Sequence, residues 1–138
     1  MPSFSNRELG SFDYEEKHII SFPEGIIGFE DMRNYIIIND EDSEPIQWLV
    51  SLDDHDLMFP VLDPSLVRRE YTGLLPPGPD RTVLLIASLK ESPEDSTVNL
   101  RSPIVIDAET RTGRQVVLAD ESLPMRYRFL EAPQGMKE

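Results

Sequence analysis

The chain has 138 residues, of which 26 are acidic and 13 basic, and its formal net charge is −13. It has no cysteine, which excludes disulfides, thiol catalysis and cysteine-ligated zinc, and it has no apolar run near the ~18 residues that cross a bilayer. This length is typical of one domain, which we expect to span residues 1–138 with frayed ends at 1–10 and 132–138, in the cytoplasm and away from membranes.

Apolar runs of strand length, separated by Pro, Gly and Asp, recur along the chain, and none continues a helical apolar stripe over three turns. They lie at residues 35–38, 46–51, 57–62, 82–89, 104–106, 115–118 and 125–129. Short strands at such spacing are typical of antiparallel barrels and sandwiches. We therefore predict an all-β, mainly antiparallel and compact β-barrel-like fold that has at most short helices.

A turn-rich segment at residues 22–30 precedes the first of these runs and carries four large apolar side chains. Its two glycines are expected to take positive φ, which tight turns require. The segment either closes one end of the barrel as a plug or displays an apolar patch rimmed by Glu24, Glu30 and Asp31. Both descriptions can hold for different side chains of the segment.

Acidic side chains are concentrated in the first half of the chain. Residues 24–56 hold ten carboxylates and a single basic group, Arg33. Phosphate backbones are bound by Lys and Arg, so this surface disfavours nucleic acid, whereas a basic protein would be attracted to it over roughly a Debye length. A solvated surface that only keeps the protein soluble is the alternative interpretation.

Two further features of the first half could carry a site but have plainer interpretations. The string Asp53-Asp54-His55-Asp56 offers metal-ligand types, yet an extended backbone would bring at most two of them together, so we expect a solvated acidic turn. Trp48 could anchor a partner, but a lone Trp within a strand is more often part of the core. We therefore predict neither a metal nor another cofactor.

The second half of the chain gives more specific structural expectations. Residues 64–71 are the one stretch that could be helical, and the proline-rich residues 76–80 are expected to form an exposed loop. Residues 83–87 are apolar throughout, which predicts a central strand covered on both faces. Residues 125–129 alternate, which predicts that their three large apolar side chains point inward and both arginines outward.

Four blocks follow one another between residues 22 and 118. They are 22–30 (FPEGIIGFE), 48–54 (WLVSLDD), 59–64 (FPVLDP) and 98–107 (VNLRSPIVID), with QVVL at 115–118 after the last. In this order they resemble the bacterial flagellar assembly factor family, FliW. The chain departs from the family pattern at Ser102, where Ala is common, and at Asp107, where Asn is common.

The resemblance implies a β-barrel-like protein that is not an enzyme. Members of the family bind newly made flagellin in the cytoplasm and also bind CsrA, a small RNA-binding translational repressor. When flagellin is scarce, the freed factor binds CsrA and relieves repression of flagellin translation. We expect the same of this chain, with flagellin and CsrA as partners, no direct contact with nucleic acid, and a monomeric state when free.

The charge distribution and the turn-rich segment together predict where the partners bind. CsrA is expected to contact carboxylates between residues 24 and 56, with apolar help from the segment at 26 and 27. Flagellin is expected to need an apolar site, because its ends are amphipathic helices of the kind that pair with grooves. The predicted partner-binding residues are Glu24, Ile26, Ile27, Glu30, Asp53, Asp54 and Asp56.

Two other classes of function compete with this one. An oligonucleotide-binding barrel that binds nucleic acid would need a basic, aromatic-lined groove, for which the arginines at 101, 111, 114, 126 and 128 are the available cations. A metal-dependent hydrolase would have to use His55.

Overall fold

The structure is a computed structural model that describes residues 3–6, 9–67, 81–119 and 122–128. Its strands are β1 (Ser3–Asn6), β2 (Gly10–Asp13), β3 (Ile20–Ser21), β4 (Asn34–Asn39), β5 (Gln47–Ser51), β6 (Met58–Leu62), β7 (Arg81–Ser88), β8 (Thr97–Val98), β9 (Ile104–Asp107), β10 (Thr112–Gln115) and β11 (Tyr127–Arg128). Short 3-10 turns occur at η1 (Glu16–His18), η2 (Glu41–Ser43), η3 (Pro64–Leu66) and η5 (Pro93–Asp95). The prediction of an all-β chain with at most short helices is confirmed.

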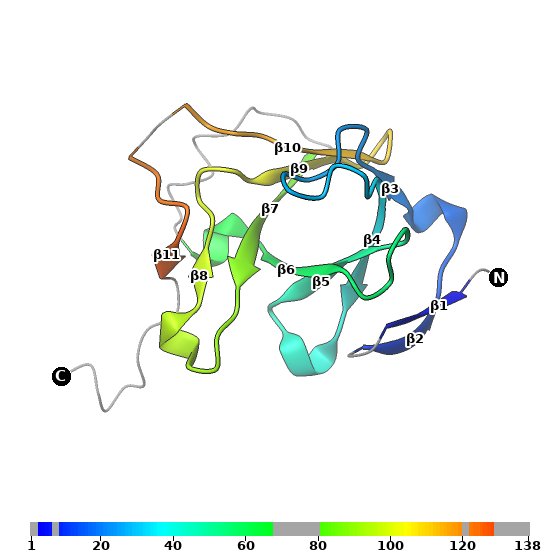
Figure 1. Ribbon diagram of the computed structural model, residues 1–138, viewed down its shortest axis with the longest axis horizontal. Helices are drawn as coiled ribbons and strands as arrows, with labels where there is room; N and C mark the ends of the chain where they lie inside the picture. The colour runs from blue at the N-terminus through cyan, green and yellow to red at the C-terminus, as the bar shows by residue number, and fades with distance from the viewer. Residues whose placement is uncertain (1–2, 7–8, 68–80, 120–121, 129–138) are drawn as a thin grey trace.

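Strands β3, β4, β5, β6, β7, β9 and β10 follow one another around a closed barrel, which Figure 1 shows nearly end-on. Neighbouring strands are antiparallel except for β10 and β3, which pair in parallel through Thr112 and Ser21. β7 closes the ring because its first half pairs with β9 and its second half with β6 and β8. The predicted β-barrel architecture is therefore confirmed.

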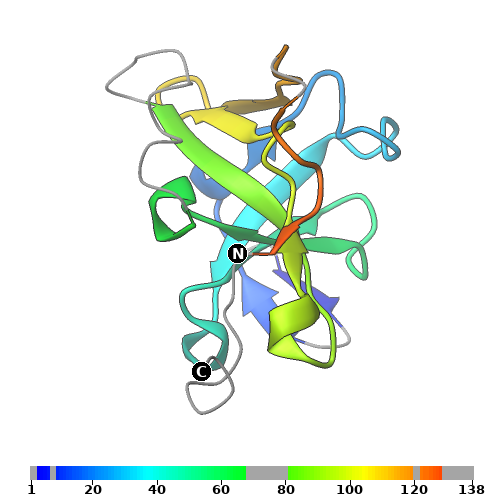
Figure 2. The ribbon, with the colours of Figure 1, turned by 90° about the vertical axis from the view of Figure 1, so that its left-hand side faces the viewer.

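Strand β7 is covered on both faces, as its unbroken apolar sequence predicted. Leu84 is buried in the barrel interior, in one cluster with Ile104. Leu85 points the opposite way, into a second cluster with Leu100. β8 and β11 extend from β7 outside the ring and contribute side chains to this second cluster, and Figure 2 shows both strands beside β7.

The barrel interior is filled by large side chains, among them Phe22 and Tyr35, which are both fully buried. Their rings meet edge to face, with centroids 5.1 Å apart. Gly113 of β10 faces the Phe22 ring, and a Cβ added to it would lie 2.5 Å from that ring, so only glycine allows this approach. The turn-rich segment that begins at Phe22 is therefore anchored in the core.

The first strands form a hairpin that packs on the outside of the barrel (Figure 1). Phe12 of β2 lies in an outer cluster with Ile36 and Val50, whose side chains point away from the barrel interior. Part of the segment that we expected to fray, Ser3–Asn6, is thus a paired strand, because the hairpin has an apolar surface to pack against. Residues 132–138 lie outside the described residues.

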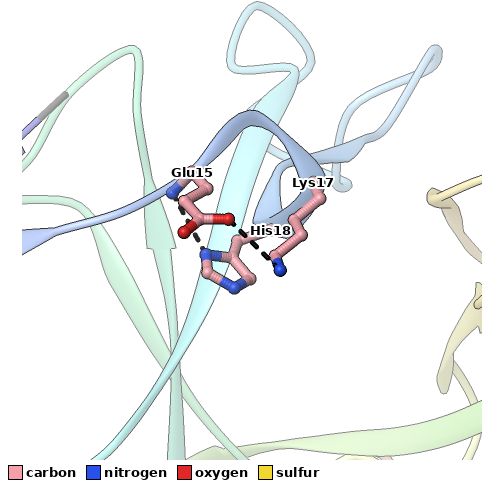
Figure 3. A network of polar contacts seen from close by, with 3 residues as sticks. All are labelled: Glu15, Lys17 and His18. Atoms are coloured by element: carbon pink, nitrogen blue, oxygen red, sulfur yellow. Dashed lines mark hydrogen bonds and ion pairs between the residues drawn. The ribbon is translucent and has the colours of Figure 1, made fainter. Parts of the chain in front are cut away.

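A short polar turn links this hairpin to the barrel. The Glu15 backbone N–H donates to Nδ1 of His18 at 3.1 Å, and Nζ of Lys17 lies 3.2 Å from Oε2 of Glu15 (Figure 3). The Arg111 guanidinium donates to the His18 carbonyl at 2.9 Å. The turn is therefore tied to the connection between β9 and β10, and the hairpin is held by polar contacts as well as by apolar packing.

Two predictions for the second half hold only in part. β11 is two residues long, and Met125 is 53% exposed, so the prediction that Met125 points inward is wrong. Strand alternation does not reach it, because the pairing with β8 begins at Tyr127. In the stretch expected to be helical, η3 is a single 3-10 turn. Residues 68–71 lie outside the described residues, as do 76–80 and Phe129.

Candidate functional site

The connection between β3 and β4, residues 22–33, is called the β3–β4 loop below and folds through consecutive tight turns. The Phe29 N–H donates to the Ile26 carbonyl at 2.6 Å, which closes the outermost turn. The predicted positive φ is confirmed at both glycines, with +70° at Gly25 and +90° at Gly28. The loop is therefore a compact, hydrogen-bonded structure rather than an extended connection.

The apolar side chains of this loop divide between the core and the solvent. Phe22 and Ile26 are buried in the barrel interior, whereas Ile27 is 60% exposed and Phe29 40% exposed. The Phe29 ring rests edge-on against Phe59 of β6, with ring centroids 5.2 Å apart. The loop thus acts as a plug through one pair of side chains and displays an apolar surface through the other, as the sequence allowed.

Gln115, at the end of β10, joins the exposed part of the loop to the barrel. The Ile27 N–H donates to its Oε1 at 2.9 Å, and its Nε2 donates to the Ser102 carbonyl at 3.2 Å. The backbone after Gln115 bonds at alternate residues to the segment 101–103, so it is extended. Val117, which is 58% exposed, therefore lies on the same side of this backbone as Gln115.

We call the exposed side chains around this contact, Ile27, Phe29 and Val117, the apolar patch. The exposed Glu30 follows Phe29 directly in the loop. Oε2 of Glu30 accepts a hydrogen bond from the Gly28 N–H at 3.0 Å. This bond, and a second one from the residue's own backbone, hold the pKa of the Glu30 carboxyl below its usual value. The patch therefore has an anionic border at neutral pH.

A depression of about 520 Å³ lies beside the loop, on the outer face of β7, β9 and β10. Arg81 and Thr112 stand on either side of Asp107 across these three strands. Glu24 from the loop and Arg114 from β10 complete its charged lining. The lining thus combines two guanidinium groups with two carboxylates, so charge alone does not select an anionic or a cationic ligand.

In the acidic turn between β5 and β6, Asp53 binds the backbone at the end of the β3–β4 loop and Asp54 binds the backbone of the turn itself. Oδ2 of Asp53 accepts hydrogen bonds from the Arg33 and Asn34 N–H groups, at 2.7 and 3.0 Å. Oδ1 of Asp54 accepts one from the Asp56 N–H at 3.1 Å. Partial burial acts to raise the pKa of the Asp53 carboxyl, but the bonds from Asn34 and Arg33 outweigh it and hold this pKa below its usual value.

The structure brings the loop and the acidic turn together, because Arg33 belongs to the loop and bonds to both sides. Its N–H donates to Asp53, and its carbonyl accepts from the Phe22 N–H at 2.7 Å. The exposed members of the predicted partner-binding set are Glu24, Ile27, Glu30, Asp53, Asp54 and Asp56. Ile26 differs from them, since it is only 2% exposed and points into the barrel.

The arginines that a nucleic-acid groove would need are dispersed over the described surface. Arg101 and Arg111 each donate to a backbone carbonyl of the chain. Arg114 lines the depression beside the β3–β4 loop, whereas Arg126 and Arg128 line another depression, of about 580 Å³, beside β8. Within the part of the chain that the structure describes, these five side chains do not share one groove.

Over residues 3–6, 9–67, 81–119 and 122–128, no group of three or more His, Asp or Glu side chains is placed to hold a metal ion. No helix within the same ranges has the length and hydropathy that crossing a bilayer requires. The string at 53–56 is a hydrogen-bonded acidic turn.

Two residues that organise the site were not predicted from the sequence. Gln115 contacts Ile27 across 88 positions of the chain, and a single sequence carries no signal of such a distant contact. Asn99 accepts hydrogen bonds from the Arg101 and Ser102 N–H groups, both at 3.0 Å, and so shapes the backbone to which Gln115 binds. An Asn that bonds to the backbone two residues on is a familiar turn signal, so Asn99 could have been found.

Comparisons with known proteins point in one direction. Residues 3–129 match the family model described as FliW protein. The flagellar assembly factor FliW of Thermosipho africanus is 35% identical over 138 residues, covering 91% of this chain and 94% of the relative. That of Leptospira interrogans serovar Lai is 32% identical over 137 residues, covering 91% of each chain. A crystal structure of the flagellar assembly factor FliW matches with a TM-score of 0.82 at 26% identity, over 94% of this chain and 98% of that one.

Proposed function

The chain belongs to the FliW family of flagellar assembly factors, and we propose that it acts by binding two other proteins, without catalysing a reaction. In this proposal it binds flagellin in the cytoplasm. When it is free of flagellin, it binds the translational repressor CsrA and relieves the repression of flagellin translation. It is a monomer before it binds, its residues 1–138 form one domain, and it does not contact nucleic acid directly.

The observation that carries the proposal is the division within the β3–β4 loop. Phe22 and Ile26 fix the loop in the barrel, while Ile27 and Phe29, two positions apart in the sequence, are 60% and 40% exposed. Full burial of an apolar side chain of this size gains about 1.5–3 kcal/mol. A partner that covers the apolar patch would recover this free energy, and the rigid base of the loop limits the entropy lost on binding.

Flagellin is the partner that we assign to the apolar patch. An amphipathic helix presents an apolar stripe that pairs with an apolar surface on its partner. Ile27 and Phe29 on the loop, with the exposed Val117 two residues beyond the Gln115 that binds the Ile27 N–H, offer such a surface. Burying these side chains would place the helix against the barrel wall at the end of β10.

CsrA is the partner that we assign to the acidic surface. An RNA-binding protein has basic surface for its phosphate contacts, and the carboxylates of residues 24–56 would attract it. Asp54 and Asp56 are exposed at the acidic turn, which Arg33 joins to the loop. Relief of repression then requires only that the chain binds the RNA-incompetent state of CsrA more tightly than the competent one.

Co-purification with each partner, separately and in competition, tests the proposal. The unmodified chain is expected to retain flagellin and to retain CsrA when flagellin is absent. Ile27→Asp places a charge in the apolar patch and is expected to abolish flagellin capture, because the carboxylate would have to be desolvated under the partner. Leu66→Asp is the matched control, since Leu66 is 54% exposed on η3, outside the patch.

Circular dichroism and thermal unfolding show whether both variants fold. If Ile27→Asp folds and still captures flagellin as the control does, the loop only closes the barrel and the assignment of flagellin to the patch fails.

A further inference from the structure

Gln115 contacts the β3–β4 loop at the backbone N–H of Ile27, one of the three residues of the apolar patch. Ile27 is 60% exposed and follows the buried Ile26 in the turn that the Phe29 N–H closes on the Ile26 carbonyl at 2.6 Å. An apolar side chain in such a turn gains free energy by folding back onto the barrel unless its backbone is held. The Ile27 N–H is held by Oε1 of Gln115 at 2.9 Å.

The Gln115 side-chain amide makes two hydrogen bonds, one as an acceptor and one as a donor. Its carbonyl oxygen accepts from the Ile27 N–H, and its amino group donates to the Ser102 carbonyl at 3.2 Å. Rotating the amide by half a turn would set N–H against N–H and oxygen against oxygen. The side chain therefore has one orientation and bridges two backbone segments.

The base of this bridge is rigid. Gln115 pairs in the β9–β10 ladder with Ile104, which is fully buried. Ser102 is 1% exposed, and its N–H is bound by the Asn99 side chain at 3.0 Å. The bridge thus connects the Ile27 turn to a part of the barrel wall that is fixed by both packing and hydrogen bonds.

We propose that Gln115 is a positioning residue for partner binding: it holds the Ile27 turn so that the apolar patch is presented before the partner arrives. This inference rests on the proposed function, in which that patch receives flagellin. Losing the bridge leaves the barrel folded but lets the turn sample other conformations. Flagellin then binds only the fraction of molecules with the turn in place, which lowers the apparent affinity by about 5- to 10-fold.

Two variants test the role of the bridge. Gln115→Met keeps the length of the side chain and removes both hydrogen bonds. Gln115→Glu keeps the acceptor for Ile27 but sets a carboxylate oxygen against the Ser102 carbonyl, and so breaks one end only. Gln47→Met is the matched control, because Gln47 is also a half-buried glutamine, and its Nε2 donates to Asn39 at 2.7 Å on β4.

Two measurements are made on each variant: amide hydrogen exchange at Ile27 and affinity for purified flagellin. Gln115→Met is expected to speed Ile27 exchange by about 10-fold or more and to weaken flagellin binding by about 5- to 10-fold. Gln115→Glu should fall between it and the unmodified chain, and Gln47→Met should change neither quantity. Thermal unfolding should stay cooperative in all three. If Gln115→Met does not fold, Gln115→Glu alone tests the proposal. It should then speed Ile27 exchange and weaken flagellin binding, each by a smaller factor than expected for Gln115→Met.

Unchanged exchange at Ile27 in both Gln115 variants would overturn the proposal, because the bridge would then not hold the turn. Faster exchange with unchanged flagellin affinity would overturn it as well. If the unmodified chain itself fails to bind flagellin, the proposed function fails, and the exchange rates still report whether Gln115 holds the turn.

Discussion

The Asp53 carboxylate accepts hydrogen bonds from two consecutive backbone N–H groups, those of Arg33 and Asn34. A carboxylate that accepts from backbone donors forms bonds stronger than those between neutral groups. These bonds hold the β5–β6 turn against the end of the β3–β4 loop. Asp53 therefore contributes to the fold by joining these two segments.

Replacing Asp53 tests this role through the pH dependence of stability. The pKa of the folded carboxyl lies below the ordinary 3.8, so its stabilising contribution is complete above about pH 4 and is lost as the pH falls through the folded pKa. We expect Asp53→Asn to lower the free energy of unfolding near pH 7 by about 1 kcal/mol, after allowance for solvent screening of this exposed group. Urea unfolding near pH 7 and near pH 3 measures the difference, which should shrink at the lower pH.

Asp31→Asn is the control for this experiment, because Asp31 is an exposed carboxylate of the same loop. It should change the free energy of unfolding by less than about 0.5 kcal/mol at either pH. A deficit of Asp53→Asn that is equally large at both pH values would contradict a role for the ionised carboxylate.

At the scale of elements, the sequence predicts best those strands that are continuous apolar runs. β4, β5, β6 and β7 match apolar runs bounded by turn residues, because their side chains are buried on at least one face. β10 lies at Thr112–Gln115, several residues before the apolar run at 115–118, because its position is set by the ladder with β9. Tertiary pairing of this kind is not encoded in local periodicity.

In the candidate site, too, features that depend on neighbouring residues could be predicted from the sequence, and contacts between distant segments could not. The glycine turns of the β3–β4 loop follow from local chemistry, whereas the sequence left open which of its side chains are buried, because Phe22 is buried against the distant Gly113 and Tyr35. The Gln115 bridge and the bonds from Arg33 and Asn34 to Asp53 depend on segments brought together by the barrel. The N-terminal hairpin was also missed, since its polar strands are placed by contacts with the outer cluster.

Trp48 is the single tryptophan of the chain and reports on the packing of this hairpin. It is half-buried and lies in the same outer cluster as Phe12. We expect Phe12→Ala to lower the free energy of unfolding by about 1–2 kcal/mol, less than for a fully buried phenylalanine, and to increase acrylamide quenching of Trp48. Ser11→Ala, on the exposed side of the same strand, should change neither. Unchanged quenching in a destabilised Phe12→Ala variant would show that the hairpin does not shield Trp48.

For the whole molecule, the attraction of a basic partner depends on the summed charge more than on any single carboxylate. The net charge is −13, and ten carboxylates fall between residues 24 and 56. Such a distribution creates a potential that extends over about 8–10 Å at physiological ionic strength. In this account it accelerates the encounter with a basic partner, while the apolar patch determines how long a partner stays.

The acidic turn allows the charge to be changed while its backbone is kept. Asn at position 54 can still accept from the Asp56 N–H, so Asp54→Asn with Asp56→Asn removes two charges and keeps this hydrogen bond. We expect this double variant to associate with CsrA about 3- to 10-fold more slowly at low salt, with little change in dissociation, and the difference should vanish near ~0.5 M salt. Stopped-flow association over a salt series measures it.

Glu91→Gln with Glu94→Gln is the control, because it removes the same charge within η5 and just before it, outside residues 24–56. Equal slowing by the control would mean that net charge alone steers the encounter and that the acidic turn has no particular part in it.

Amide hydrogen exchange of the chain alone and mixed with purified flagellin shows whether the chain recognises another polypeptide through the β3–β4 loop. We expect exchange to slow at residues 24–32 and around Val117, and β1, β2 and η2 to exchange as before. Slowed exchange confined to other surfaces, with residues 24–32 unchanged in a mixture that binds, would contradict recognition through this loop.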